Sequence, residues 1–184
     1  FARIDQRRGG EQLFRTTLEK ALFSSPAACL ETIRNRVRRL ADQTAPEVRR
    51  DIEQLESFAA QVATITPADF AKYQKLLAII RDRDDGFGWN GKATDDRLVI
   101  FTERIETLKF LQTHLPQDIG LKEAAVAVLY GSMGDIEQQR IVEEFGKEES
   151  PIRLLLASDV ASEGINLHYL SHRLIHFDIP WSLM

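Results

Sequence analysis

Three hydroxyl side chains follow short apolar runs in the second half of the chain. They are Thr102 after residues 98–101, Ser132 after 125–130 and Ser158 after 152–157. If these runs are parallel strands, their carboxyl ends meet at one edge of a sheet, where ligands bind in such folds. A hydroxyl beside a helix start lies where backbone N–H groups and the helix dipole favour phosphate. A lone Ser or Thr at such a position is more often only a helix cap. Three hydroxyls on one edge predict a surface that follows a phosphate backbone.

The elements that must position these hydroxyls are predicted strands that alternate with predicted helices. A fourth apolar run occupies residues 174–177, and helical spacing of apolar residues recurs over 105–115 and 136–145. Continuous apolar strands that alternate with helices are typical of a parallel sheet covered on both faces. We therefore expect an α/β fold with a doubly wound parallel sheet in this half.

In the first half of the chain, apolar residues recur at helical spacing throughout residues 11–85. Ser25 followed by Pro26 is a helix start, because Ser caps and the missing N–H of Pro costs nothing at the first helical position. A further helix is expected to open at Thr66-Pro67. The turn formers of residues 82–96 predict a loop. We expect an all-helical segment and linker over residues 1–92 and the sheet domain over 93–184.

The helical half contains an arginine run and the only cysteine. The run comprises Arg34, Arg36, Arg38 and Arg39. It could contact nucleic-acid phosphates, or it could be the solvated face of an amphipathic helix, which is the commoner case. Cys29 lies on the apolar side of the same helix and is expected to be a small core residue. Both interpretations of the arginines stay open at this point.

Composition and missing motifs exclude several classes of protein. The net charge is −4, which argues against nonspecific coating of nucleic acid but permits a local phosphate-binding surface. No apolar run is long enough to span a bilayer. One cysteine cannot form a zinc site of thiolates. His168, His172 and His176 are four apart, but the last two fall at a predicted strand, so no metal is expected there. Glycine-rich phosphate and dinucleotide loops are absent.

Four segments resemble the motifs of one protein family. Residues 98–103, LVIFTE, resemble motif IV of superfamily-two helicases and translocases, and residues 130–133, YGSM, resemble the element that follows it. Residues 154–167, LLLASDVASEGINL, are similar to motif V, and 175–181, IHFDIPW, to the strand after it. Their order and spacing look most like the Swi/Snf-type branch in its bacterial form. The helical half looks like the segment that precedes the second lobe in such proteins.

The resemblance implies the second RecA-like lobe of an ATP-driven nucleic-acid motor. It assigns backbone phosphate contacts to Thr102, Ser132 and Ser158. It assigns Gly164 and Asn166 to the ATP site between two lobes, with Asp159 organising the loop and coupling it to the nucleotide. ATP and Mg²⁺ are the implied cofactors of the full-length protein, and double-stranded DNA and the first RecA-like lobe are the implied partners. A cytoplasmic, nucleoid-associated location and no membrane partner are expected.

The motif VI arginines of the family are not found, and no catalytic residue is assigned in this chain. We therefore expect a fragment that ends before motif VI and hydrolyses no ATP alone. One alternative is a noncatalytic, degenerate helicase lobe that binds partner proteins. Another is a small-molecule enzyme on an unrelated Rossmann-like sheet, although such enzymes carry a glycine fingerprint that is missing here.

Overall fold

The computed structural model describes residues 2–158 and 171–178. The chain divides into two compact units, Phe1–Thr66 and Pro67–Met184. The division falls earlier than the boundary at 92/93 that the sequence predicted. The reason lies in the helix and the loop that precede the sheet, both of which pack into the sheet unit.

The first unit consists of three helices, α1 (Ala2–Ser24), α2 (Pro26–Leu40) and α3 (Pro46–Val62). The predicted cap between the first two is confirmed, because the Ser25 hydroxyl oxygen accepts a hydrogen bond from the Ala28 N–H at 3.1 Å. Cys29 is fully buried in the core of this unit, and burial raises the pKa of its thiol. The cysteine is thus the small core residue that the sequence predicted.

The arginines of α2 have contacts within their own unit. Arg34 and Arg38 both lie near the carboxylate of Glu31, at 3.5 and 3.8 Å. The Arg36 guanidinium lies 4.8 Å from the centre of the Phe14 ring. Such contacts are those of the solvated face of an amphipathic helix, with the guanidinium of one arginine over an aromatic ring. Nothing in this arrangement requires a nucleic-acid partner.

The second unit is built on a parallel sheet of four strands, β1 (Arg97–Thr102), β2 (Val126–Leu129), β3 (Leu154–Ser158) and β4 (Ser171–His176). Their order is β2-β3-β1-β4, and every neighbouring pair is parallel. β1 and β3 are buried along their whole length, which explains why their sequences are continuous apolar runs instead of alternating ones. The predicted α/β fold with a parallel RecA-like sheet is confirmed.

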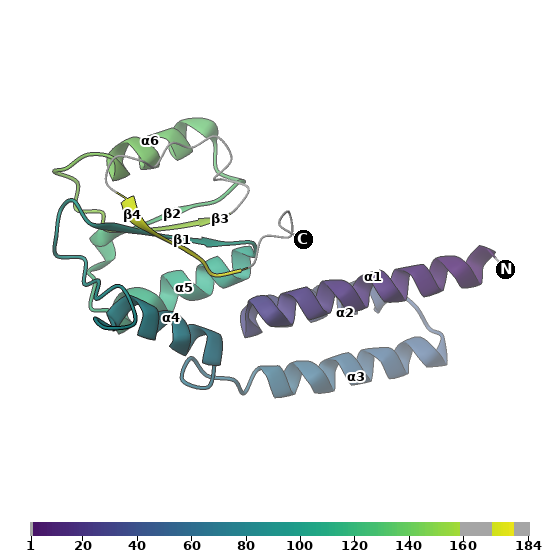
Figure 1. The fold of residues 1–184 in the computed structure, drawn as a ribbon. Coiled ribbons are helices and arrows are strands. Elements are labelled where there is room, and N and C mark those ends of the chain that lie inside the picture. The colour runs from purple at the N-terminus through teal and green to yellow at the C-terminus, as the bar shows by residue number, and fades with distance from the viewer. Residues whose placement is uncertain (1, 159–170, 179–184) are drawn as a thin grey trace. The chain divides into compact units, whose positions relative to one another are not determined.

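Helices cover both faces of this sheet (Figure 1). One face packs against α4 (Ala71–Arg81) and α5 (Ile105–Asp118), whose apolar residues share a core with Leu98, Ile100, Leu154 and Leu156. The opposite face packs against α6 (Asp135–Phe145), which contributes Phe145 to a core with Val99, Phe101, Leu129 and Leu155. Successive residues of β1 and β3 therefore enter different cores, because side chains alternate across a strand.

The helix α4 belongs to the sheet unit. Tyr73 and Ile80 of α4 are fully buried there, and the Tyr73 hydroxyl donates a hydrogen bond to Asp118 at 2.5 Å. The helix begins at Ala71 and not at Thr66-Pro67. Phe70 precedes it and packs edge-on against Phe110 and Phe177, at ring-centre distances of 5.7 and 6.2 Å. The backbone of Phe70 is not helical, with φ −81° and ψ 88°.

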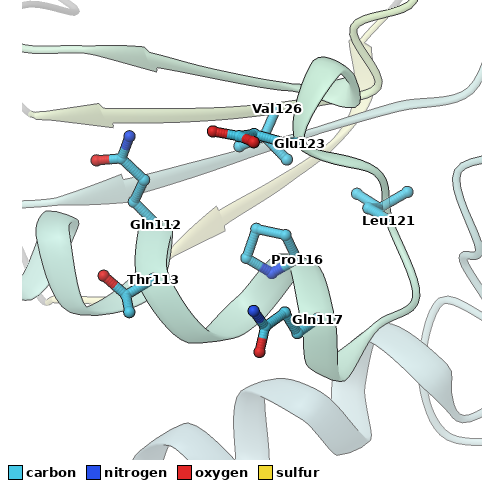
Figure 2. A pocket seen from close by; sticks show the side chains of 7 residues that line it. All are labelled: Gln112, Thr113, Pro116, Gln117, Leu121, Glu123 and Val126. Atoms are coloured by element: carbon cyan, nitrogen blue, oxygen red, sulfur yellow. The ribbon is translucent and has the colours of Figure 1, made fainter.

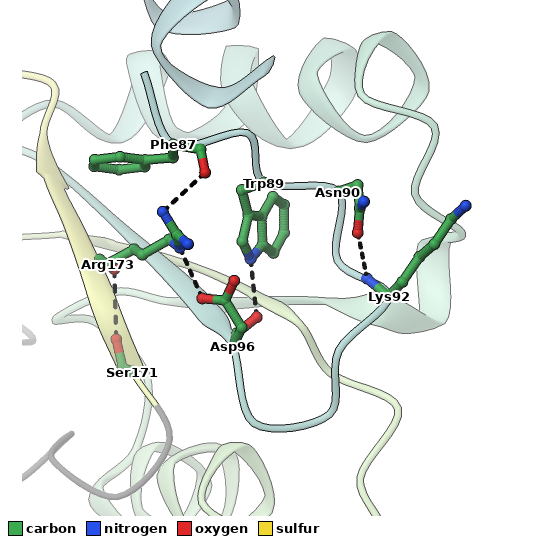
Figure 3. A network of polar contacts seen from close by, with 7 residues as sticks. All are labelled: Phe87, Trp89, Asn90, Lys92, Asp96, Ser171 and Arg173. Carbon is green, nitrogen blue, oxygen red and sulfur yellow. Dashed lines mark hydrogen bonds and ion pairs between the residues drawn. The ribbon is translucent and has the colours of Figure 1, made fainter. Parts of the chain in front are cut away.

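The loop between α4 and β1 is held against the sheet by polar contacts (Figure 3). The Arg173 side chain of β4 donates from Nε to Asp96 at 2.8 Å and from a terminal nitrogen to the Phe87 carbonyl at 3.0 Å. The buried Trp89 donates from Nε1 to the Asp96 carbonyl at 2.8 Å. Gly91 has φ +66°, a conformation that a Cβ would strain. The predicted loop is confirmed, but it is part of the sheet unit.

No helix within the described residues combines the length and the apolar character needed to cross a bilayer.

Candidate functional site

The three predicted hydroxyl residues lie at the same edge of the sheet. Thr102 and Ser158 end adjacent parallel strands and are paired in register. Ser132 lies on the loop that follows β2, the other neighbour of β3, and the N–H of Gly131 in this loop donates to the Ser158 hydroxyl oxygen at 3.3 Å. The predicted shared edge is confirmed. The binding of phosphate by these residues stays a prediction.

The hydroxyls differ in how much of them solvent can reach. Ser132 is exposed, whereas Ser158 and Thr102 are buried with only 3% and 1% of their surface accessible. The Ser132 loop is itself held in place, since the Met133 N–H donates to the Tyr130 carbonyl at 3.1 Å and Gln138 of α6 donates to the Met133 carbonyl at 2.9 Å. Ser132 is therefore the hydroxyl that a ligand at this edge meets first.

Thr102 already has a partner within the protein. Its hydroxyl donates to the Oδ2 atom of Asp178 at 2.6 Å, and the N–H of Glu103 donates to the same oxygen at 3.0 Å. A hydroxyl has one proton to donate, so the Thr102 O–H cannot also donate to a phosphate oxygen. In this structure Thr102 joins the ends of β1 and β4.

Asp178 accepts hydrogen bonds from two segments of the sheet unit, the end of β1 and α4. Besides Thr102 and Glu103, the ammonium group of Lys72 in α4 lies 2.7 Å from Oδ1. Lys72 also lies over the Phe177 ring, 4.2 Å from its centre. Burial alone would raise the pKa of Asp178, but the hydrogen bonds from Lys72 and Thr102 together outweigh burial and the pKa is lowered. The carboxylate is therefore ionised at neutral pH and holds α4, β1 and β4 together.

Three residues that the sequence assigned to a nucleotide site lie outside the described residues. They are Asp159, Gly164 and Asn166. They follow Ser158, the last residue of β3. His168 also lies outside the described residues, whereas His172 and His176 lie in β4 and are exposed. The His176 ring stacks on Phe101 with 5.3 Å between ring centres.

Acidic side chains lie at the start of both helices that follow β1 and β2. Glu106 lies in the first turn of α5, and Asp135 and Glu137 lie in the first turn of α6. Carboxylates at these positions are favoured by the partial positive charge of a helix amino end. They also repel a phosphate that approaches the same end. Phosphate binding at this edge therefore depends on hydroxyls, backbone N–H groups and any cation that is not already paired.

A surface hollow of about 420 Å³ lies at the opposite end of the strands (Figure 2). Its lining comes from the second half of α5 and from the segment that leads into β2: Gln112, Thr113, Pro116, Gln117, Leu121, Glu123 and Val126. Val126 is the first residue of β2. Because the hydroxyl residues follow the carboxyl ends of the strands, this hollow is not part of the candidate site.

Sequence reasoning missed the parts played by Lys72 and Asp178. Asp178 could have been suspected, since it directly follows an apolar run in the same way as the predicted hydroxyls. Lys72 carries no local signal, because it lies 106 residues away from its partner and on a different element.

The strand order, the helices on both faces and the shared carboxyl edge define a RecA-like α/β lobe. The sequence of residues 71–184 matches the helicase conserved C-terminal domain. This match spans more than half of the chain, and the chain belongs to that family. It begins at the first residue of α4, in agreement with the packing of this helix into the sheet unit.

Curated relatives include several proteins named as ATP-dependent helicases. The probable ATP-dependent RNA helicase DDX43 of Homo sapiens is 28% identical over 88 residues, covering 48% of this chain and 12% of its own. The ATP-dependent RNA helicase RhlB of Pseudomonas syringae pv. tomato is 29% identical over 110 residues, covering 59% and 23%. The uncharacterized ATP-dependent helicase YqhH of Bacillus subtilis is 31% identical over 120 residues, covering 60% and 20%. The chain thus spans a quarter or less of each relative.

Two solved structures are similar at low identity. The Sulfolobus solfataricus SWI2/SNF2 ATPase C-terminal domain aligns with a TM-score of 0.47 at 20% identity, covering 83% of this chain and 66% of that one. The Pyrococcus furiosus Hef helicase domain aligns with a TM-score of 0.48 at 17% identity, covering 82% and 36%. The family assignment rests on the sequence match and not on these alignments.

Proposed function

We propose that this chain is the second RecA-like lobe of an ATP-dependent nucleic-acid motor of superfamily two, in the bacterial Swi/Snf-like branch. In the full-length protein this lobe would close on a first lobe around ATP and move along duplex DNA. Membership of the helicase C-terminal domain family supports the motor class. The resemblance of residues 98–103 and 154–167 to motifs IV and V supports the branch. A cytoplasmic, nucleoid-associated location belongs to the same proposal.

One observation carries the nucleic-acid part of this proposal. Thr102, Ser132 and Ser158 come from three different strand ends and lie at one edge of one sheet. Contacts to phosphates carry no base information, which suits a motor that must move along any sequence. We assign the direct contact to Ser132. Ser158 holds the Gly131 backbone beside Ser132, and Thr102 holds the end of β1 through Asp178.

The nucleotide part of the proposal rests on the resemblance of motif V. Gly164 would let the backbone come close to ATP, and the Asn166 amide could both donate to and accept from a ribose hydroxyl. Asp159 would link this loop to the phosphate-binding edge. ATP with Mg²⁺ would supply the phosphoryl chemistry in the full-length protein. This chain would contribute orientation of the nucleotide and closure of the site.

A noncatalytic module that binds partner proteins is the second candidate. The carboxylates of Glu106, Asp135 and Glu137 in the first turns of α5 and α6 favour it, because they disfavour a polyanion. The ATPase activity of the full-length protein separates the two candidates. A motor hydrolyses ATP faster when duplex DNA is present, whereas a binding module shows no turnover above background under either condition. Parallel assays with duplex DNA, single-stranded DNA and RNA identify the preferred nucleic acid.

Replacing Ser132 with Ala in the full-length protein is expected to weaken duplex DNA binding about three- to tenfold. The loss corresponds to the net contribution of one typical hydrogen bond at an exposed position, about 1 kcal/mol. Fluorescence anisotropy with a labelled duplex measures it. The matched control is Ser57→Ala, which removes an exposed hydroxyl from α3. Equal affinity of the Ser132 variant and the wild type would remove this residue from the interface.

Replacing Asn166 with Ala is expected to lower ATP turnover about tenfold, the effect of losing roughly one hydrogen bond made in the active complex. Binding of DNA without ATP should change little, because the amide is assigned to the nucleotide and not to the nucleic acid. Steady-state ATPase assays and DNA titrations without nucleotide measure the two effects. A variant that changes only the melting temperature would show that the residue has a structural role.

A further inference from the structure

We propose that the free edge of β2 and the hollow beside it bind an extended segment of a partner protein that carries a basic side chain (Figure 2). The segment would join the sheet as a further strand next to β2, and its basic side chain would enter the hollow. This inference goes beyond the proposed function and does not depend on it. The hollow is lined by Val126, the first residue of β2, whereas the candidate phosphate site lies past the last residues of the strands.

The backbone of β2 offers hydrogen-bonding groups on the side away from β3. In the part of the chain that the structure describes, β2 pairs with β3 and no strand lies on its other side. The Ala125 carbonyl accepts from the Arg153 N–H at 2.8 Å and so faces β3, whereas the Val126 N–H donates to the Glu123 carbonyl. Because backbone groups alternate along a strand, Val128 presents its N–H and C=O at the free edge. Such an edge binds another strand through main-chain hydrogen bonds.

The side chains of Val126 and Val128 are only half-buried. Both pack against the core on the α5 face, as do the half-buried Leu121 and Tyr130. Apolar side chains that stay partly accessible on an outermost strand become more buried when a further strand is added, which favours its binding. A partner segment with apolar residues at alternate positions therefore fits this edge, because alternate side chains of a strand share one face.

The hollow next to β2 offers several hydrogen-bond acceptors. The Thr113 hydroxyl donates to the Lys109 carbonyl at 2.9 Å, so that its oxygen is left to accept. Pro116 has no N–H to offer the Gln112 carbonyl four residues earlier in α5. Glu123 adds a carboxylate from the turn before β2, and its side chain lines the hollow together with that of Gln112 (Figure 2).

The charge of the hollow favours a cation. Among the described residues that line it, Glu123 is acidic and none is basic. Within the described ranges Glu123 makes no ion pair, so its carboxylate is open to a ligand. A lysine or arginine side chain brings N–H donors and no acceptor, which complements both the carboxylate and the other acceptors. An acidic segment would be repelled from the same place.

A synthetic peptide tests the inference on the full-length protein. The probe is a fluorescein-labelled ten-residue peptide that alternates threonine and valine around one central lysine, and fluorescence anisotropy measures its binding. The wild type should bind it at protein concentrations up to about 100 μM, the range of weak complexes. A peptide with glutamine in place of the lysine should bind about three- to fivefold more weakly, since one exposed charge contact is lost. The lysine peptide with methylated backbone nitrogens should not bind, because it cannot donate main-chain hydrogen bonds.

Two variants and one control locate the peptide on the protein. Glu123→Gln should lower the affinity for the lysine peptide about three- to fivefold and leave the affinity for the glutamine peptide unchanged. Val128→Pro removes an N–H from the free edge and should weaken both peptides about tenfold. Proline is tolerated on an outermost strand where the N–H faces solvent, and a thermal melt checks that this variant is folded. Glu148→Gln neutralises another exposed carboxylate, in the loop after α6, and should change neither affinity.

The outcomes leave the inference either supported or overturned. A wild type that does not bind the lysine peptide, or that binds the methylated peptide equally well, would overturn it. Equal losses for Glu123→Gln and Glu148→Gln would show a general charge effect and would overturn it too. Displacement of the peptide by duplex DNA would place the peptide at the other edge, with the same consequence. The proposed function is judged separately, by the ATPase assay with DNA, and its failure would leave these peptide results as they are.

Discussion

Replacing Asp178 with Ala is expected to lower the free energy of unfolding of the sheet unit by about 3 kcal/mol. Removal of one partner of a buried ion pair leaves the other groups without a counterpart and costs roughly 3–5 kcal/mol. Here the Thr102 hydroxyl, the Glu103 N–H and the Lys72 ammonium group would all lose their acceptor. Partial solvent access to Lys72 places the expected cost at the lower end of this range.

The difference between the Asp178 variant and the wild type is expected to depend on pH. The pKa of Asp178 is lowered in the folded protein, so the carboxylate contributes stability above the unfolded pKa near 4. This contribution is lost as the pH falls through the lower folded pKa. The wild type and the variant should therefore differ most at neutral pH and converge in acid.

Urea unfolding followed by tryptophan fluorescence measures this effect, since Trp89 is buried in the core of the sheet unit. Asp95→Ala is the control, because Asp95 is exposed and lies in the loop before β1. The role assigned to the Asp178 carboxylate would be contradicted if Asp178→Ala lowered the free energy of unfolding by less than about 1 kcal/mol at neutral pH. A loss that does not change with pH would contradict it as well.

Replacing Leu155 or Leu156 with Ala is expected to lower the free energy of unfolding of the sheet unit by about 3 kcal/mol in each case. Both side chains are fully buried in the middle of β3, and they enter different cores, Leu155 on the α6 face and Leu156 on the α5 face. A buried Leu→Ala change loses the transfer free energy of the removed atoms and leaves a cavity, for a total of about 2–5 kcal/mol. Nearly equal losses of unfolding free energy in the two variants are expected for a sheet that is covered on both faces.

The same urea experiment checks the two leucine variants at neutral pH. Leu174→Ala on β4 is the control, because 49% of the Leu174 surface is exposed and its expected cost is below about 1 kcal/mol. If one of the two β3 variants costs as little as the Leu174 variant, then one face of β3 is open to solvent. That result would contradict the two-sided packing of the sheet.

The sequence by itself determined the kind of fold and the edge of the sheet that carries the candidate site. Buried parallel strands must be apolar along their whole length, so residues 98–101 and 152–157 could be recognised as strands without a structure. Parallel strands place their carboxyl ends together, and the clustering of Thr102, Ser132 and Ser158 therefore followed from the topology alone. These inferences need only local patterns and one geometric rule.

Only the tertiary structure decided the strand order, the place where the second unit begins and the bond that occupies Thr102. The helix α4 has the same apolar period as the helices before it, so nothing local shows that Tyr73 and Ile80 are buried with the sheet. The Thr102 hydroxyl looks available in the sequence, yet it donates a hydrogen bond to Asp178, which lies 76 residues further along the chain. Hydrogen bonds of this kind form between side chains that the fold brings together, and the spacing of residues along the chain carries no record of them.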